Sequence, residues 1–558
     1  MPTRALSMLL VLMPIVAAEL PGQEPRPTTL AGRSTVYAPN GAVATSHPLA
    51  TSAALSVLQA GGTAADAAVA AAAVLNVVEP HMTGIGGDMF ALLWSAEEER
   101  LVGLESVGAA GSLMTPEALA ARGHESVPVR GVEAVTVPGA LAGWAALIDR
   151  YGRLTLGDVL APAIRLAEAG FPVSPIIARE WAEAADVLQE DPGAAATYLV
   201  DGNRGPVAGE WVRNPDFART LRHIADQGPA TLYGGELGRQ IAGHVRQTGG
   251  FITLEDLAAH EARWVEPVSA EFRGYRLWQM PPPGQGIAAL QMLRILDGFD
   301  LGAMDHNSAE YLHHLIEAKK LAFADLAAYV ADPDHMAVTP ERLLSDDYVQ
   351  ARRDALDPGR ALDRPDPGPA LTDSETIYLS VADNHGNMVS FINSIFYAFG
   401  SGVVVPGTGF ALQNRGTGFS MEAGHPNRVA PGKRPFHTII PAFVTRTTPA
   451  GETPWLSYGV MGGSMQPQGH VQVLLNLLVF GMDLQQALDA PRFRHLDGQR
   501  VALEAPIRDD VRARLLQLGH QVLEPEGTAF GGAQAVLRLT SGWAAASDPR
   551  KDGHAGGH

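Results

Sequence analysis

Residues 373–383 have the sequence Asp-Ser-Glu-Thr-Ile-Tyr-Leu-Ser-Val-Ala-Asp, in which an acidic, turn-prone stretch ends at Thr376 and an apolar strand begins. This order is typical of a buried N-terminal nucleophile. A threonine hydroxyl is a weak nucleophile, but a threonine that begins a chain has its own α-amino group as general base, with an ordinary pKa of about 7.7–8.0. The segment therefore predicts that the chain cuts itself before Thr376 to become active. The simpler alternative is a threonine that only starts a strand.

The composition restricts the classes of function. The 558 residues are 46% apolar and 18% charged, which is typical of a compact globular enzyme. The formal net charge of −19 argues against nucleic acid or an anionic membrane surface as a partner, because both would repel the protein. Cysteine is absent, which excludes disulfides, thiolate nucleophiles, iron–sulfur clusters and cysteine zinc sites.

The N-terminus resembles an export signal. Residues 1–18 place Arg4 before an apolar run that ends in small residues, so we expect a signal peptide and a secreted or periplasmic protein. A first strand is the alternative. The Ala-rich run Ala64–Val78 contains Asp66 and Asn76 and is shorter than the roughly 20 residues of a membrane span. It predicts a small-residue helix in the core.

The spacing of apolar residues divides the chain into a helix-rich part and a strand-rich part. In the first part, helices are predicted over 49–60, 64–80, 286–296 and 313–329, and residues 141–315 are expected to be mainly helical. The Pro- and Asp-rich stretch 357–373 is the expected linker. Beyond it we predict strands over 376–383, 388–395, 455–461 and 533–546, a helix over 468–480, and a disordered tail after Lys551. These elements predict a layered α/β sandwich.

Two further patterns bear on chemistry. Gly462 and Gly463 lie between a predicted strand and a predicted helix, where their amides could form an oxyanion hole; a plain turn is the alternative. His313 and Glu317 lie one helical turn apart and could bind a metal, but adjacent helix histidines are more often structural. We therefore expect no metal site and no cofactor. The glycine-rich turn 84–87 lacks the residues of a phosphate loop and is expected to serve close backbone packing.

A series of motifs, taken jointly, carries a family resemblance. Upstream they are His81-Met-Thr-Gly-Ile-Gly-Gly-Asp88, Val135-Thr-Val-Pro-Gly-Ala140 and Ala167-Glu-Ala-Gly-Phe-Pro172. Downstream they are Thr376–Asp383, Asn384-His-Gly-Asn387, Phe399-Gly-Ser-Gly402, Leu412-Gln-Asn-Arg-Gly416, Gly432-Lys-Arg-Pro435, Gly462-Gly463 and Ser547-Asp-Pro-Arg550. In order and spacing the chain resembles the γ-glutamyltranspeptidase family over about residues 30–550.

The resemblance implies an N-terminal-nucleophile hydrolase with an αββα sandwich. It implies a large subunit of residues 19–375 and a small subunit of residues 376–558, made by self-cleavage between Glu375 and Thr376 and held together as a heterodimer. Thr376 would be the nucleophile, and the hydroxyl of Ser394 would support its amino group. Gly462 and Gly463 would form the oxyanion hole. The acyl-donor site would be lined by Asn414, Arg415, His437 and Thr438.

Departures from the family pattern bear on the substrate. Members that bind glutamate use an Arg for its α-carboxylate and an Asp for its α-amino group. Here the loop Leu104–Gly111 has no Arg, Gly418 stands at the Asp position, and Phe396 replaces an Asn. The peptide before Lys433 is also too short for the lid of many members. The chain thus resembles the lidless branch of the family, which includes cephalosporin acylases and oxamate amidohydrolases. In this chain Arg415 would then anchor the acid group of a donor that lacks an amino group.

Three functions remain open from the sequence. The family's default activity is hydrolysis of γ-glutamyl amides such as glutathione, or transfer of the γ-glutamyl group to an amine. The missing Arg and Asp favour hydrolysis of other small-molecule amides, such as glutaryl or oxamyl amides. A catalytically silent secreted binding protein is the alternative from a different class.

Overall fold

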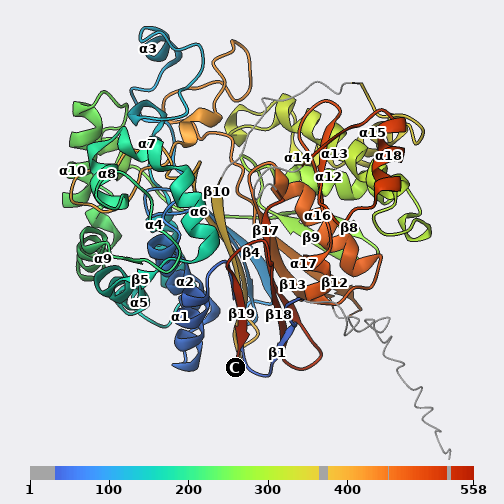
Figure 1. Cartoon of the computed structure of the whole chain (residues 1–558), viewed down its shortest axis with the longest axis horizontal. Helices are drawn as coiled ribbons and strands as arrows, with labels where there is room; N and C mark the ends of the chain where they lie inside the picture. Colours follow the sequence, from blue (N-terminus) through green and yellow to red (C-terminus); the bar gives the residue numbers. More distant parts are fainter. Residues whose placement is uncertain (1–31, 364–374, 450, 525–529) are drawn as a thin grey trace, which may run out of the picture.

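The computed structural model describes residues 32–363, 375–449, 451–524 and 530–558. The predicted signal peptide and most of the predicted linker lie outside the described residues. Two antiparallel sheets of seven strands each occupy the centre of the molecule, and helices lie on either side of them (Figure 1). The predicted α/β class is confirmed.

The first sheet contains the predicted nucleophile. Its order is β19 (His554–Gly557), β2 (Ala42–Thr45), β10 (Glu375–Ala382), β11 (Met388–Phe396), β3 (Asp88–Ser95), β4 (Arg100–Ser106) and β7 (Arg263–Val265). Strands β10 and β11 form the predicted hairpin, with Ser380 opposite Ser390. The strand of Thr376 is therefore central and paired on both sides, which fixes its position.

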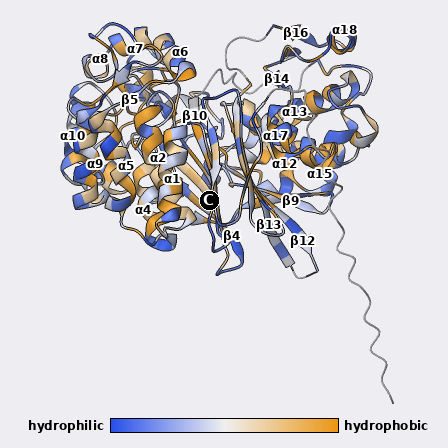
Figure 2. Ribbon diagram, turned by 60° about the horizontal axis from the view of Figure 1, so that its bottom comes forward, coloured by the Kyte–Doolittle hydropathy of each residue, from blue (hydrophilic) through white to orange (hydrophobic). Residues whose placement is uncertain are grey.

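The helices α1 (Pro48–Gln59), α2 (Ala64–Val78) and α4 (Ala140–Tyr151) cover this sheet. Every residue of α2 is buried, and a capping box between Thr63 and Asp66 closes its N-terminus. Its alanines let the helix axis come close to β10 and β11. In Figure 2, α1 and α2 are mostly hydrophobic, whereas α9 (Pro215–Gln227) and α10 (Glu236–Gln247) carry more hydrophilic residues.

The second sheet packs against the first. Its order is β1 (Val36–Ala38), β18 (Trp543–Ser547), β17 (Gly532–Arg538), β13 (Gly451–Met461), β12 (Ala442–Thr448), β9 (Tyr275–Gln279) and β8 (Val268–Phe272). It is covered by α12 (Gly286–Leu296), α16 (Met465–Leu478) and α17 (Leu484–Asp489), and α13 (Ala309–Tyr329) packs on α12. Strands β8 and β9 lie within the stretch expected to be mainly helical. Each has only five residues, some of them polar or charged, so their alternation is weak.

The remaining helices and strands complete the fold. The helices are α3 (Pro116–Ala120), α5 (Leu156–Ala169), α6 (Pro175–Glu183), α7 (Ala185–Gln189), α8 (Pro192–Tyr198), α11 (Leu254–Ala258), α14 (Pro340–Leu343), α15 (Asp346–Asp354) and α18 (Asp509–Gln517). The strands are β5 (Phe171–Pro172), β6 (Trp211–Val212), β14 (Phe493–His495), β15 (Arg500–Leu503) and β16 (Gln521–Leu523).

The prediction of a disordered tail after Lys551 is wrong. Residues 554–557 form β19, which pairs with β2, and the carbonyl of His558 accepts from the amide of Asn40 at 2.9 Å. A Cβ at Gly557 would lie 2.3 Å from the Cβ of Ala38, so glycine permits this close approach. The glycines that indicated disorder in the sequence are there for packing.

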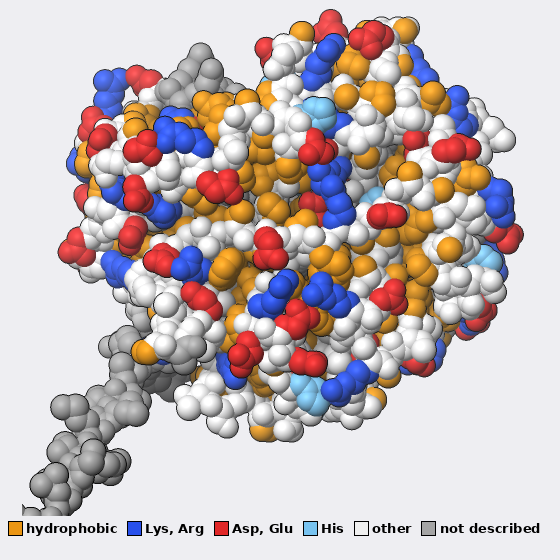
Figure 3. Space-filling view, turned by 180° about the vertical axis from the view of Figure 1, so that it is seen from behind, with side chains coloured by type: hydrophobic (Ala, Val, Ile, Leu, Met, Phe, Trp, Pro, Cys, Tyr) orange, Lys and Arg blue, Asp and Glu red, His pale blue; other side chains and the backbone are white. Residues whose placement is uncertain are grey.

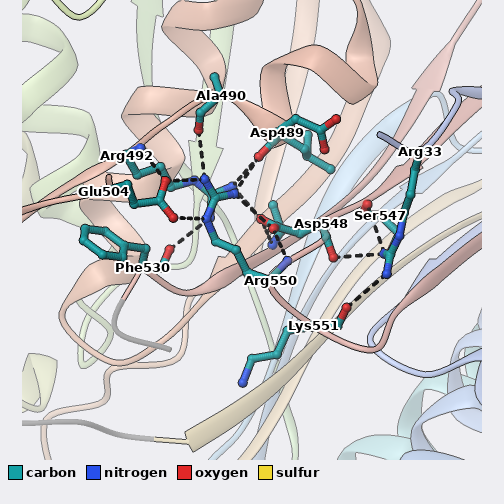
Figure 4. Close-up of polar contacts among 12 residues, drawn as sticks. Arg33, Asp489, Ala490, Arg492, Glu504, Phe530, Ser547, Asp548, Arg550 and Lys551 are labelled. Carbon is teal, nitrogen blue, oxygen red and sulfur yellow. Dashed lines mark hydrogen bonds and ion pairs between the residues drawn. The ribbon is translucent and has the colours of Figure 1, made fainter. Parts of the chain in front are cut away.

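The motif Ser547-Asp-Pro-Arg550 forms a buried ionic network where β18 ends (Figure 4). Asp548 accepts from Arg492 at 2.6 Å and from Arg550 at 3.1 Å, and Arg550 also binds Glu504. Arg33, from the start of the described chain, donates to the carbonyl of Asp548 at 3.0 Å. The network therefore joins residues that are far apart in sequence.

The surface carries both signs of charge. On the face shown in Figure 3, Lys and Arg side chains alternate with Asp and Glu, and neither sign gathers into a large patch. Among the described residues, no helix combines the length and the hydropathy of a membrane span.

Candidate active site

Thr376 lies at the start of β10, at an irregularity of the sheet. Glu375 is opposite Phe396 and Ile377 is opposite Asn393, so the register shifts at Thr376. The shift is a β-bulge, which releases one residue from regular pairing. The hydroxyl of Thr376 donates to the hydroxyl of Ser394 at 3.3 Å, and both side chains are fully buried. The structure thus brings these two predicted site residues together.

Ser394 also shapes the end of β11. Its hydroxyl accepts from the amide of Phe396 at 2.8 Å, and Phe396 has a φ of +82°. This left-handed conformation is rare for residues other than glycine, asparagine and aspartate. The turn brings the Phe396 ring under the guanidinium of Arg415, with 4.3 Å between the Arg415 Cζ and the ring centroid.

The glycine-rich turn before β3 packs against the same strand end. A Cβ at Gly87 would lie 2.2 Å from the carbonyl oxygen of Ser394, and one at Gly86 would lie 2.2 Å from that of Ala411. Only glycine leaves room for such contacts. The close backbone packing predicted for this turn is confirmed.

Arg415 is a fully buried cation. Its Nη1 donates to the hydroxyl of Thr438 at 3.0 Å, whereas Nε and Nη2 have no hydrogen-bond partner among the described residues. Burial lowers the pKa of Arg415 to about 10, against the charge of Asp88, which raises it. Two unused donors on a buried cation form a site for an anionic oxygen.

Asn414 and His437 make their contacts with the protein itself. The amide of Asn414 donates to the carbonyl of Val129 at 2.7 Å and accepts from the backbone amide of Tyr397 at 3.2 Å. Both ring nitrogens of His437 are also engaged, Nδ1 with the carbonyl of Pro435 and Nε2 with Asp88. Their predicted role in lining the donor site stays a prediction.

The two glycines follow β13 and precede α16, as predicted. Gly462 has a φ of +120° and Gly463 a φ of +53°. A Cβ at Gly462 would lie 3.1 Å from the Cα of Gly531. The turn therefore requires glycine for its conformation and at Gly462 also for space. The N-terminus of α16 adds a partial positive charge beside the turn.

Gln285 connects the glycine turn with Thr438, which is predicted to line the donor site. Its Nε2 donates to the carbonyl of Gly463 at 2.8 Å and to that of Thr438 at 2.5 Å. Neither Gln285 nor Asp88 was among the predicted site residues. Gln285 lies in the turn Pro281–Gly286, and Asp88 is the last residue of the His81–Asp88 motif; these were the sequence features that could have indicated them.

His313, Glu317 and His520 form a buried cluster on and beside α13. One ligand atom from each lies within 4.8 Å of the others. However, the Nζ of Lys320 donates to Glu317 at 2.7 Å, and the Nδ1 of His313 is 2.8 Å from the Nε2 of His520. An ammonium group on the only carboxylate of the cluster opposes a divalent cation. The arrangement indicates a structural hydrogen-bond network.

Comparisons with known proteins place these observations in context. A sequence model described as gamma-glutamyltranspeptidase matches residues 50–558. The glutathione hydrolase-like YwrD proenzyme of Bacillus subtilis is 37% identical, over 92% of this chain and 98% of that protein. The oxamate amidohydrolase proenzyme of Klebsiella pneumoniae is 37% identical, over 93% and 98%. The crystal structure of cephalosporin acylase from Bacillus halodurans matches with a TM-score of 0.89 and 44% identity, covering 96% of this chain and 99% of that one.

Proposed function

The chain belongs to the γ-glutamyltranspeptidase family, and from this premise we propose that it is a self-cleaving amidohydrolase with Thr376 as its nucleophile. The two facing sheets with helices outside them are assigned to the αββα sandwich of N-terminal-nucleophile hydrolases. The observation that carries the proposal is the buried hydroxyl of Thr376, placed at a β-bulge and bonded to Ser394. The relatives' description as proenzymes supports it.

Self-cleavage would use the same hydroxyl as catalysis. The Oγ of Thr376 attacks the carbonyl carbon of Glu375, the peptide C–N bond breaks, and the nitrogen takes a proton to become the free α-amino group. Water then hydrolyses the resulting ester, leaving a carboxylate on Glu375 and the hydroxyl on Thr376. The products are a large subunit ending at Glu375 and a small subunit beginning at Thr376, which form a heterodimer.

In turnover, the freed amino group takes the proton of the Thr376 hydroxyl as its oxygen attacks the amide carbonyl of the donor. The amides of Gly462 and Gly463 stabilise the developing oxyanion, a role typically worth about 10²–10³ in rate for one donor. The amine then leaves with the proton, and the acyl ester on Thr376 is hydrolysed by water or transferred to an amine acceptor.

The donor class is proposed from Arg415. A buried cation with two unused N–H groups suits a carboxylate, and it would repel the ammonium of a γ-glutamyl group. Glu105, which lies in β4 within the stretch that lacks the family's Arg, is paired with Arg263 at 2.9 Å and contacts Arg434. Acid acyl groups without an amino group, such as glutaryl or oxamyl, are therefore favoured. Hydrolysis of γ-glutamyl amides such as glutathione is the second candidate, favoured by the family membership.

Two measurements test the proposal. A denaturing gel of the purified protein is expected to show two fragments, whereas a silent binding protein would give one. A panel of glutaryl, oxamyl and γ-glutamyl amides is expected to give the higher kcat/KM for the first two. Faster turnover of γ-glutamyl-p-nitroanilide than of its glutaryl counterpart would instead support the glutathione-hydrolase function.

The compartment is also a proposal. The apolar run of residues 1–18 supports export to the periplasm or beyond the cell. N-terminal sequencing of the large fragment from a periplasmic fraction is expected to start after that run.

A further inference from the structure

His437 is held between two hydrogen-bond acceptors. Its Nδ1 lies 2.7 Å from the carbonyl oxygen of Pro435, which can only accept, so Nδ1 carries a hydrogen. Its Nε2 lies 2.9 Å from Oδ2 of Asp88. The other oxygen of Asp88 accepts from the amides of Gly108 at 2.9 Å and Gly139 at 3.1 Å. The contact between Nε2 and Oδ2 is therefore a hydrogen bond only if one proton lies between these atoms.

That proton fixes the charge of the pair. With the proton on His437, an imidazolium faces a carboxylate; with the proton on Asp88, a neutral ring faces a carboxylic acid. Both arrangements have a net charge of zero. Without the proton, a ring lone pair would face a carboxylate at a place where both side chains are fully buried, which is strongly unfavourable.

The charge of the Asp88–His437 pair acts on the buried guanidinium of Arg415. Asp88 and Tyr397 are the acidic groups that act on it, and Tyr397 brings a phenol rather than a carboxylate. The other titratable groups that face Asp88 are Glu105, His260 and Tyr233. Glu105 is already paired with two arginines, Arg263 and Arg434. Because the Asp88–His437 pair is neutral overall, it does not balance the charge of the Arg415 guanidinium, and Asp88 is the carboxylate among the described residues that acts on Arg415.

We propose that the Asp88–His437 pair determines donor specificity by holding one proton, so that Arg415 keeps its positive charge available for the carboxylate of an acid acyl group. The inference rests on the proposed function, because it concerns the donor site of that reaction. Asp88 and His437 are positioning residues here. They act through Arg415 and through Thr438, which follows His437 in sequence and accepts from Arg415.

The test is a set of charge variants. His437→Gln keeps an N–H donor to Asp88 but cannot carry the additional proton, so the pair loses one positive charge and its remaining negative charge offsets that of Arg415. We expect kcat/KM for glutaryl-p-nitroanilide to fall on the order of tenfold to a hundredfold. For pentanoyl-p-nitroanilide, which lacks the carboxylate, we expect a loss about tenfold smaller than for the glutaryl donor.

The matched control is the double variant. Asp88→Asn with His437→Gln removes the negative charge again, and the asparagine oxygen can still accept from Gly108 and Gly139. We expect it to restore the preference for the glutaryl donor, and Asp88→Asn alone to keep it. Equal loss for both donors in His437→Gln, or no restoration in the double variant, would overturn the inference in favour of a purely structural pair.

A second readout does not depend on turnover. In ¹⁵N-histidine spectra of the whole processed protein, both nitrogens of His437 are expected to carry or share a proton, in a signal that disappears in His437→Gln. A neutral ring with a free Nε2 lone pair would contradict the inference. Self-cleavage on a gel and turnover of any donor report separately on the proposed function, so the two failures are distinguishable.

Discussion

The hydroxyl of Thr376 donates to the hydroxyl of Ser394 across 3.3 Å at a β-bulge of a central strand. The hydroxyl is thus directed away from solvent. In this position Thr376 follows Glu375, whose carbonyl is the proposed point of attack, and has a hydroxyl partner on the paired strand.

Replacing Thr376 by alanine is expected to leave one uncut chain, because the attacking hydroxyl is gone. Thr376→Ser keeps a hydroxyl and is expected to cut, more slowly. A denaturing gel and N-terminal sequencing of the small fragment check both variants. A fragment beginning at any residue other than Thr376 would refute the assignment.

Ser394→Ala is expected to slow cleavage and turnover by about tenfold, because the bonds to Thr376 and to the amide of Phe396 are both lost. Ser394→Thr keeps the hydroxyl and is the matched control. Rates of precursor loss and of donor hydrolysis provide the measurement. Identical rates for the alanine variant and the native protein would exclude a role for this hydroxyl.

At Gly463, proline removes the backbone N–H and cannot adopt the φ of +53°, whereas alanine keeps the N–H at a strain of about 1–2 kcal/mol. We expect Gly463→Pro to lower kcat by about 10²–10³ and Gly463→Ala far less. Thermal unfolding of both variants separates lost catalysis from lost folding. If stability and activity fall in parallel, the turn serves packing only.

Arg415→Ala is expected to lower kcat/KM for glutaryl donors by about tenfold to a hundredfold, and to affect donors without a carboxylate much less. Arg415→Lys keeps the charge but not the planar fork, so intermediate values are expected. Steady-state kinetics with paired donors are the measurement. A loss that is equal for charged and uncharged donors would show that Arg415 has a structural role and does not bind the donor carboxylate.

Arg492→Ala leaves Asp548 buried with Arg550 as its remaining ion-pair partner among the described residues, and is expected to destabilise the protein by about 3–5 kcal/mol. The control is Arg508→Ala, which breaks a solvent-exposed pair with Asp510 and is expected to change stability little. Denaturant unfolding compares the two. A similar small loss in both would show that the network in Figure 4 contributes little.

The same network predicts an acid sensitivity. Burial raises the pKa of Asp548, but the charges of Arg492 and Arg550 outweigh it, so the pKa lies below its usual value. A carboxyl whose pKa is lowered on folding stabilises the protein above its unfolded pKa, and this contribution is lost as the pH falls. Unfolding midpoints measured between neutral pH and about pH 3 are expected to fall more steeply in the native protein than in Arg492→Ala.

Local patterns predicted the fold best where they were strong. The helix of alanines before Pro80 and the hairpin at Asn384–Asn387 follow from apolar spacing and turn residues in adjacent positions. Strands β8 and β9 escaped prediction because each has only five residues, too few for a clear alternation. The tail was predicted wrongly because glycine indicates flexibility locally, while its packing against Ala38 depends on the whole fold.

The candidate site also combines features that follow from neighbouring residues with contacts that depend on the whole fold. The positions of Thr376 at a strand start and of Gly462 and Gly463 between a strand and a helix could be predicted from neighbouring sequence, whereas their proposed roles come from the family resemblance. The pairing of Asp88 with His437 joins residues 349 positions apart, and nothing near either residue indicates the other. Gln285 likewise reaches Thr438 and Gly463 across 153 and 178 positions. Such contacts follow from the order of strands, which a single sequence does not reveal.

That strand order has a consequence for the proposed cleavage before Thr376. In the first sheet, β2 from before the proposed cleavage point lies between β10 and β19 from after it, and in the second sheet β1, β8 and β9 flank strands from after it. Each of the two seven-stranded sheets therefore contains strands from both proposed fragments. Neither contains all the strands of either seven-stranded sheet, so separating them would require unfolding both sheets, and fragments expressed from two genes would have to fold in each other's presence.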